Sequence, residues 1–137
     1  MMITVNDVRL LNFPKFADAR GNLSFAEEGQ QIPFTLKRAY WIYDVPGGES
    51  RGAHAHKNLE QLIIALSGSF VVTLDDGREK REFFLNRPYQ GLYVGPGLWR
   101  NLEEFSSGAV AMVLASELYS EDDYIRDYSE FLAFRGL

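Results

Sequence analysis

The chain contains no cysteine and only two histidines among its 137 residues. The absence of cysteine excludes disulfides, thiolate metal sites and a cysteine nucleophile, and it fits a reducing compartment. Acidic residues outnumber basic ones by 19 to 14, and the net charge of -5 disfavours nucleic acid as a partner. No apolar stretch reaches the length of a membrane span and no signal peptide is evident, so we expect a cytoplasmic protein without a membrane partner.

The two histidines, His54 and His56, stand two residues apart in the string RGAHAHK. In an extended strand such side chains project from the same face, so both imidazoles enter one space while Ala53 and Ala55 occupy the opposite face. A pair of this kind can ligate a metal, move protons near neutral pH, or lie solvated on a surface strand. Its position between a Pro-Gly-Gly turn and an apolar run favours a place inside the fold.

Length and composition predict one domain over residues 1–137, since 46% hydrophobic and 24% charged residues are ordinary for a globular protein. Short runs rich in β-branched and aromatic residues, separated by turns, predict an all-β sandwich or barrel. The predicted strands are residues 34–44, 51–56, 61–66, 69–74, 80–85, 91–94, 98–103 and 109–116. Ser67-Gly68 predicts a tight hairpin, Asp76-Gly77 a type I′ turn, and residues 95–97 a sharp reversal.

The end of the chain has a helical pattern. Ser120 resembles an N-cap followed by acidic residues 121–123, and apolar residues then recur at helical spacing. These are Tyr124, Ile125, Tyr128, Phe131 and Leu132. We therefore expect one short helix whose aromatic face packs against the sheet, and we assign it no chemistry.

The segment around the histidines resembles the first motif of the cupins, which are small jelly-roll barrels. The matching residues are Gly48, His54, His56 and Gly68. At the position of the usual carboxylate ligand the chain has Gln61, with Glu60 one residue out of register, and in the second motif Arg100 takes the place of the third histidine. An arginine has no lone pair for a metal, and two histidines with an amide make a poor ligand set. We therefore expect no metal.

Two histidines facing an arginine suit acid–base chemistry instead. The Arg100 cation lowers the pKa of nearby imidazoles and can stabilise an oxyanion, which favours proton abstraction next to a carbonyl. The alternative for Arg100 is a surface ion pair with Glu103 or Glu104.

Four segments together resemble the sugar 3,4-ketoisomerases over essentially the whole chain. They are residues 51–57, 18–23, 96–100 and 123–126. The resemblance implies a cofactor-independent isomerase that moves the ketone of thymidine-diphosphate (dTDP) 4-keto-6-deoxy-glucose from C4 to C3, in bacterial pathways to surface polysaccharides. The family removes a proton at C3 and delivers one at C4, and its acid–base roles carry over to His54 and His56, in an order that stays open.

The resemblance also implies a substrate-binding set, which comprises Arg100, Arg20, Arg51, Lys57, Tyr40, Tyr43 and Gln61. Family members differ at the positions of Arg20 and Arg100, in ways tied to the gluco or galacto product. Arg51 and Lys57 either bind the pyrophosphate or lie on a solvated strand edge, and strand alternation turns Arg51 away from the histidines unless a bulge intervenes. The two tyrosines either reach the sugar or thymine or belong to the core.

The family forms homodimers that exchange the N-terminal strand, and the segment Ile3 to Phe13 has the apolar residues for such a strand.

Three other functions stay open: a 3,5-epimerase, for which no third histidine is present; a metal-dependent cupin dioxygenase, which needs Glu60 as a ligand; and a non-catalytic sugar-nucleotide-binding cupin.

Overall fold

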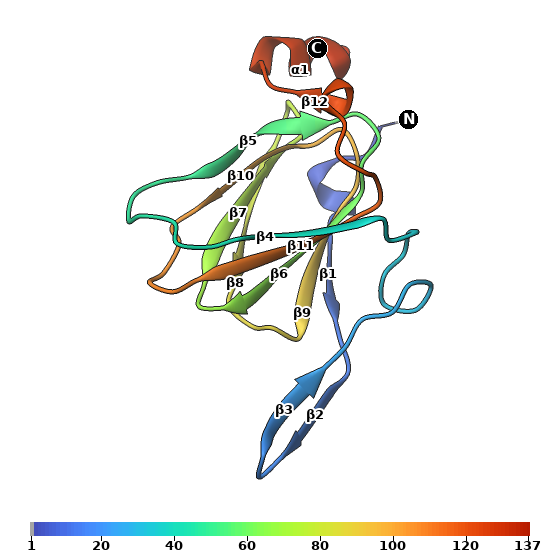
Figure 1. Ribbon diagram of the computed structural model, residues 1–137. Helices are drawn as coiled ribbons and strands as arrows, with labels where there is room; N and C mark the ends of the chain where they lie inside the picture. The colour runs from blue at the N-terminus through green and yellow to red at the C-terminus, as the bar shows by residue number, and fades with distance from the viewer. Residues whose placement is uncertain (1) are drawn as a thin grey trace.

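Two five-stranded sheets packed face to face make up the body of the protein, as Figure 1 shows for a computed structural model that describes residues 2–137. The first sheet has the order β1 (Arg9–Asn12), β9 (Gln90–Val94), β6 (Gln61–Ser67), β11 (Val110–Ala115) and β4 (Arg38–Ile42). The second has the order β12 (Tyr124–Ile125), β5 (Arg51–His56), β10 (Trp99–Glu103), β7 (Phe70–Asp75) and β8 (Lys80–Leu85). All neighbouring strands are antiparallel. The predicted all-β sandwich with one short C-terminal helix is confirmed.

The core lies between the sheets because apolar residues alternate along the strands. Val72 and Leu74 of β7 face Leu92 and Val94 of β9 in one buried cluster, and all four are fully buried. The intervening residues of β7 face outward and are less buried. This period of two is the pattern that the sequence showed.

All eight predicted strands are present, with differences at their ends. The predicted limits of 51–56 and 80–85 coincide with β5 and β8. The run 34–44 is too long, because β4 begins only at Arg38. Phe34 leaves the strand to pack with Phe13 and Ile32 in a second cluster on the outer face of the first sheet.

The predicted hairpin at Ser67-Gly68 is wrong, since β6 and β7 belong to different sheets. Gly68 has a φ of +64°, and a Cβ there would lie 2.4 Å from the Ser106 hydroxyl, so the turn that crosses the sandwich requires glycine. The hairpin at Asp76-Gly77 is confirmed, but β7 and β8 pair up to Asp75 and Lys80, which leaves a loop of residues 76–79 rather than a two-residue type I′ turn. Residues 95–97 join β9 to β10 in the opposite sheet.

A hairpin that the sequence analysis did not predict extends away from the sandwich (Figure 1). It consists of β2 (Lys15–Asp18) and β3 (Gly21–Ser24), paired only with each other. Its Phe16 and Leu23 are 61% and 60% exposed, and Phe16 stacks on Phe25 with ring centroids 6.2 Å apart.

The predicted C-terminal helix starts later than its pattern indicated. Residues 121–123 form a 3-10 turn, η2 (Glu121–Asp123), in which Ser120 makes no side-chain cap, and Tyr124 and Ile125 then pair with β5. The helix α1 (Tyr128–Phe134) follows, capped by the Asp127 side chain. A shorter 3-10 turn, η1 (Val5–Asp7), precedes β1. None of the helices within residues 2–137 is long and apolar enough to cross a membrane.

Candidate active site

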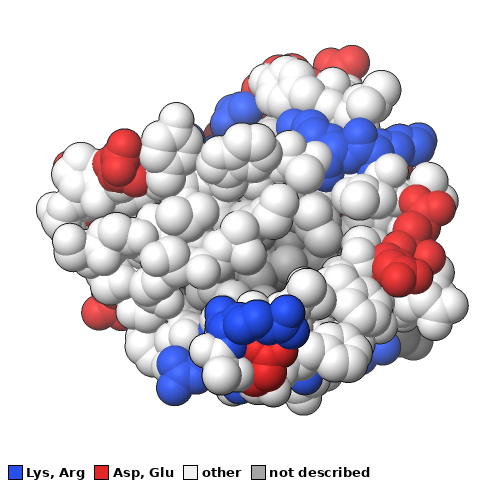
Figure 2. Space-filling model, turned by 60° about the horizontal axis from the view of Figure 1, so that its bottom comes forward, with Lys and Arg blue, Asp and Glu red and all other residues white. Residues whose placement is uncertain are grey.

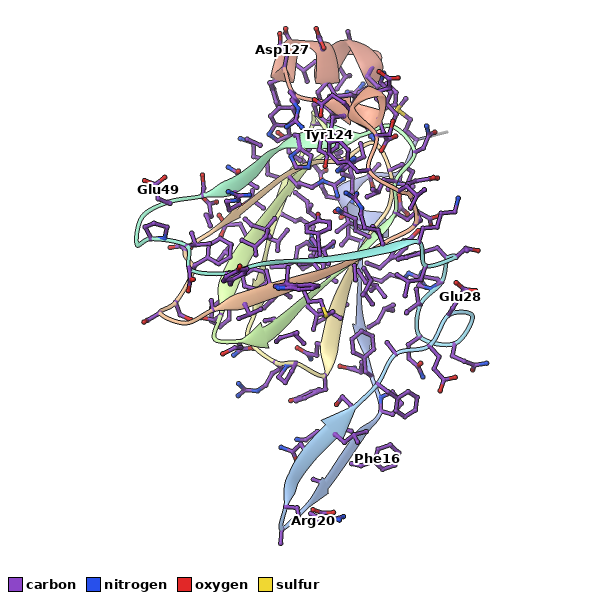
Figure 3. The ribbon with its side chains drawn as sticks, in the orientation of Figure 1. Phe16, Arg20, Glu28, Glu49, Tyr124 and Asp127 are labelled. Carbon is purple, nitrogen blue, oxygen red and sulfur yellow. The ribbon has the colours of Figure 1, made fainter. Side chains whose placement is uncertain are left out.

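A cavity of about 900 Å³ opens between the two sheets, beside β4, the edge strand of the first sheet, and β5 of the second. The inner face of β4 lines it with Arg38, Tyr40 and Ile42, and residues of β5 and β10 line it from the second sheet. The loop between β4 and β5, where Glu49 is labelled in Figure 3, completes the rim.

His54 and His56 project from one face of β5, as their spacing predicted. Their Nε2 atoms are 3.1 Å apart and the rings lie edge to face. His54 lines the cavity, whereas His56 is 1% exposed and lies behind it. Ala55 points the other way into a buried cluster with Ile125 and Phe131.

A β-bulge in β5 brings Arg51 to the same cavity. Arg100 pairs with His54 and Asn101 pairs with Gly52, so Ala53 is an extra residue with a φ of +57°. A Cβ on Gly52 would lie 3.1 Å from the Arg100 carbonyl oxygen, which explains the glycine. The bulge reverses the alternation of side chains, and Arg51 consequently lines the cavity with His54.

Arg100 lies inside the protein and is 1% exposed, so the interpretation as a surface ion pair with Glu103 or Glu104 is wrong. Its guanidinium donates to the Gln61 side-chain oxygen and, over 3.0 Å, to the Leu98 carbonyl oxygen, while its Nε has no hydrogen-bond partner. The Gln61 amide donates in turn to the Tyr40 hydroxyl over 2.8 Å. A buried cation is therefore held in the wall of the cavity.

Burial and the Arg100 cation together lower the pKa of His54 to about 4. The same two causes lower the pKa of His56. Both rings are consequently neutral at pH 7 and able to accept a proton. Burial also lowers the pKa of Arg100 to about 10, which still leaves it cationic at neutral pH.

Two residues at the histidine pair were missed because the helical pattern concealed them. Asp123 Oδ2 lies 3.0 Å from His56 Nδ1. The Tyr124 ring packs against both imidazoles, with centroids 4.9 Å from His54 and 4.4 Å from His56. The pairing of β12 with β5 places them there, a long-range contact that local periodicity does not reveal.

The rim of the cavity carries more positive charge than the predicted set. Besides Arg51, the side chains of Arg38 and Arg126 line it. Arg126 lies over the Tyr124 ring at 4.2 Å and pairs with Glu121. Tyr43 also lines the cavity and is exposed.

Arg20 and Lys57 lie outside this cavity. Arg20 is at the tip of the β2–β3 hairpin, far from Tyr124 in Figure 3, where it pairs with Asp18 and its side chain is 90% exposed. The Lys57 side chain is exposed, and its backbone N–H donates to the Asp123 carbonyl oxygen. The chain's own fold therefore brings together all of the predicted site residues except these two.

The residues present do not fit the metal that many cupins hold. Within residues 2–137, no group of three or more His, Cys, Asp or Glu is arranged to bind a metal ion. Gln61 and Arg100 stand beside the histidines instead, and the Arg100 cation repels a divalent ion. Glu60, the other candidate ligand, accepts a hydrogen bond from Tyr93 and is not among the cavity residues.

Comparison with known proteins gives consistent matches. Residues 6–136 match the family model described as FdtA: WxcM-like, C-terminal. The chain is 51% identical to TDP-4-oxo-6-deoxy-alpha-D-glucose-3,4-oxoisomerase from Aneurinibacillus thermoaerophilus, over 90% of this chain and 88% of the relative.

Two solved structures of 3,4-ketoisomerases are similar throughout. The Helicobacter canadensis enzyme is 48% identical with a TM-score of 0.92, covering 95% of this chain and 98% of that one. A histidine-to-asparagine mutant of QdtA from Thermoanaerobacterium thermosaccharolyticum, in complex with TDP-4-keto-6-deoxyglucose, is 40% identical with a TM-score of 0.93, covering 96% and 95%. A dTDP-4-dehydrorhamnose 3,5-epimerase from Bacillus anthracis, 20% identical with a TM-score of 0.77 over 89% of this chain and 81% of its own, shares the fold.

Proposed function

Because the chain belongs to the WxcM-like, C-terminal (FdtA) family, we propose that it is a 3,4-ketoisomerase that moves the ketone of TDP-4-keto-6-deoxyglucose from C4 to C3. The observation that carries the proposal is the pair of neutral imidazoles, His54 and His56, beside the buried Arg100 cation in one cavity. A neutral base can remove a proton next to a carbonyl, and a fixed positive charge beside it stabilises the oxyanion that forms.

The first half of the reaction forms an enediolate. The histidine pair takes the proton from C3, the electrons of that C–H bond form the C3–C4 double bond, and the carbonyl π electrons move to O4. The Arg100 guanidinium, a cation in the wall of the cavity, stabilises the negative charge on O4.

The second half places the ketone at C3. The O3 proton passes to O4, the O3 electron pair forms the new carbonyl, and the electrons of the double bond take a proton from the histidine pair at C4. Atoms and charges balance without a redox cofactor, since the substrate and the product are isomers. Among the described residues, the side chains around the histidines do not make a metal-ligand set, so they do not support the alternative of a metal-dependent dioxygenase.

The cationic rim suits the diphosphate of a sugar nucleotide. Arg38, Arg51 and Arg126 come from three different strands or turns, and charge-assisted hydrogen bonds from guanidinium groups match phosphate oxygens. Tyr43, exposed at the same rim, offers a face on which the thymine ring stacks, and Tyr40 and Gln61 line the inner wall that meets the sugar. This arrangement holds the reactive carbons near His54.

A homodimer is part of the proposal. Phe16 and Leu23 are too exposed for a hairpin that lies free in water, and the face in Figure 2 is broad and largely without charged side chains. In the single chain β1 pairs with its own β9, and exchange of the segment Ile3 to Phe13 would form the same pairing with a second copy. In such a dimer, Arg20 and the exposed Lys57 side chain bind substrate only if they reach the cavity of the partner subunit.

The proposed location is the cytoplasm, and the cysteine-free composition supports a reducing compartment.

The function is tested by giving purified protein TDP-4-keto-6-deoxyglucose labelled with 13C and locating the carbonyl carbon by NMR. We expect the carbonyl signal to move to C3. A ketone that stays at C4 would contradict the proposal, and bound but unchanged substrate would favour the non-catalytic alternative.

A further inference from the structure

The histidine pair ends at a carboxylate. Asp123 Oδ2 lies 3.0 Å from His56 Nδ1, and His56 Nε2 lies 3.1 Å from His54 Nε2. The side chains of Asp123, His56 and His54 therefore form a chain of polar contacts from the 3-10 turn η2 to the cavity. His56 and Asp123 are largely shielded from solvent, with side chains 1% and 10% exposed.

Asp123 is held in place by the backbone of the two residues that follow His56. Its Oδ1 accepts from the Asn58 N–H over 2.7 Å, and its carbonyl oxygen accepts from the Lys57 N–H over 2.9 Å. The next residue, Tyr124, pairs with His56 in the β12–β5 ladder. Both carboxylate oxygens are thus committed, one to the backbone and one to the imidazole.

These contacts fix where the protons lie. A carboxylate only accepts, so His56 carries its proton on Nδ1 and, being neutral, presents a lone pair at Nε2. A hydrogen bond between the two rings then requires the proton on the facing Nε2 of His54. The alternative, with two lone pairs facing each other over 3.1 Å, has no hydrogen bond.

We propose that Asp123 is a positioning residue that fixes the tautomer of His56 and thereby turns the two histidines into a directed relay for one proton. The inference rests on the proposed function. The proton from C3 goes to His54 Nδ1, the ring nitrogen that does not face His56, while the His54 Nε2 proton moves to His56 Nε2. The positive charge then rests on His56 beside the Asp123 carboxylate, and the relay runs backwards when C4 is protonated.

This assignment also gives the two histidines different roles. His54 exchanges the proton with the sugar, and His56 holds the second proton, and with it the positive charge, at a place from which water is excluded. When the second proton returns from His56 to His54 Nε2, His54 releases the proton taken from C3 to C4 of the same molecule. The Tyr124 ring, packed against both imidazoles, prevents them from turning away from each other.

The variant Asp123→Asn reverses the relay without changing the shape of the side chain. Its amide oxygen replaces Oδ1 as the acceptor for the Asn58 N–H, so its NH₂ group faces His56 Nδ1 and forces the His56 proton onto Nε2. We expect kcat to fall about 100-fold, the scale of a lost acid–base function, with KM changed less than about twofold. The matched control is Asp122→Asn, the exposed neighbour in the same turn, which should keep its activity.

The decisive readout is independent of activity. Because the chain has only two histidines, 15N-histidine NMR of the untagged protein gives two rings to assign. We expect the wild type to carry protons on His56 Nδ1 and His54 Nε2, and Asp123→Asn to carry the His56 proton on Nε2. A wild-type His56 protonated at Nε2, or an Asp123→Asn variant as active as Asp122→Asn, would overturn the assignment.

The wild-type spectrum needs no variant, so the inference stays testable even if Asp123→Asn does not fold. A wild type with the expected tautomers that leaves the ketone at C4 would refute the proposed function while supporting the position of Asp123.

Discussion

Arg100 is the direct register partner of His54 in the β5–β10 ladder, and the bulge at Ala53 begins at that pair. The bulge therefore sets the distance between the buried cation and the imidazole that lines the cavity. It also turns Arg51 toward the same space. One irregular residue in an otherwise regular sheet thus brings a base, an oxyanion stabiliser and a diphosphate ligand together, which is a common use of bulges near active sites.

Replacing Arg100 by Met should raise the pKa of His54 from about 4 toward its ordinary value of 6.5, because the like charge is removed while burial remains. An NMR titration of the two histidines measures this shift. Isomerisation should fall about 100-fold, the scale of a lost oxyanion stabiliser. The control Arg51→Met removes a rim charge that is not among the main causes of the lowered pKa of His54, and an equal shift in both variants would contradict the assignment.

Stability should increase with pH between about 4 and 6.5. The pKa of His54 is about 4 in the folded protein and near 6.5 in the unfolded chain, so between these values the unfolded state binds more protons and acid favours unfolding. The His56 shift has the same sign. Urea unfolding at several pH values measures the slope, and His54→Asn should flatten it. A stability that falls as pH rises through this range would refute neutral, buried histidines.

His54→Asn and His56→Asn should each reduce isomerisation by about 100-fold or more, the scale of a lost general acid or base. Neither change opens a large cavity, so circular dichroism and the thermal midpoint should stay close to wild type. Wild-type rates in both variants would remove the histidines from the mechanism.

Phe131→Ala should destabilise the protein by about 3–5 kcal/mol, because it empties a fully buried position between α1 and the β5–β12 pair. The loosened turn should also weaken the Asp123 contact with His56 and lower activity. Chemical denaturation measures the first effect. Phe84→Ala, at a position 61% exposed, is the control and should change stability by less than about 1 kcal/mol.

The parts that the sequence predicted depend on local patterns. Alternation of apolar residues located the strands, and the two-residue spacing placed His54 and His56 on one face. The alternation rule also stated the condition under which Arg51 joins them, namely a bulge, and the bulge is present.

The parts that it missed depend on contacts between distant residues. The spacing of Tyr124 and Ile125 fits a helix as well as a strand, and only their pairing with β5 decides between the two. Asp123 consequently reaches His56 across 67 positions of sequence. The crossing at Gly68 likewise depends on which sheet each strand joins, which a turn motif does not specify.

The most direct test of the account is proton NMR of the chelator-treated protein with TDP-4-keto-6-deoxyglucose in deuterated water, following the signals at C3 and C4. The account predicts a 3-keto product, with the proton couplings at C4 giving its gluco or galacto configuration. Exchange at C3 and C5 without migration of the ketone, or activity that returns only with added metal, would contradict it.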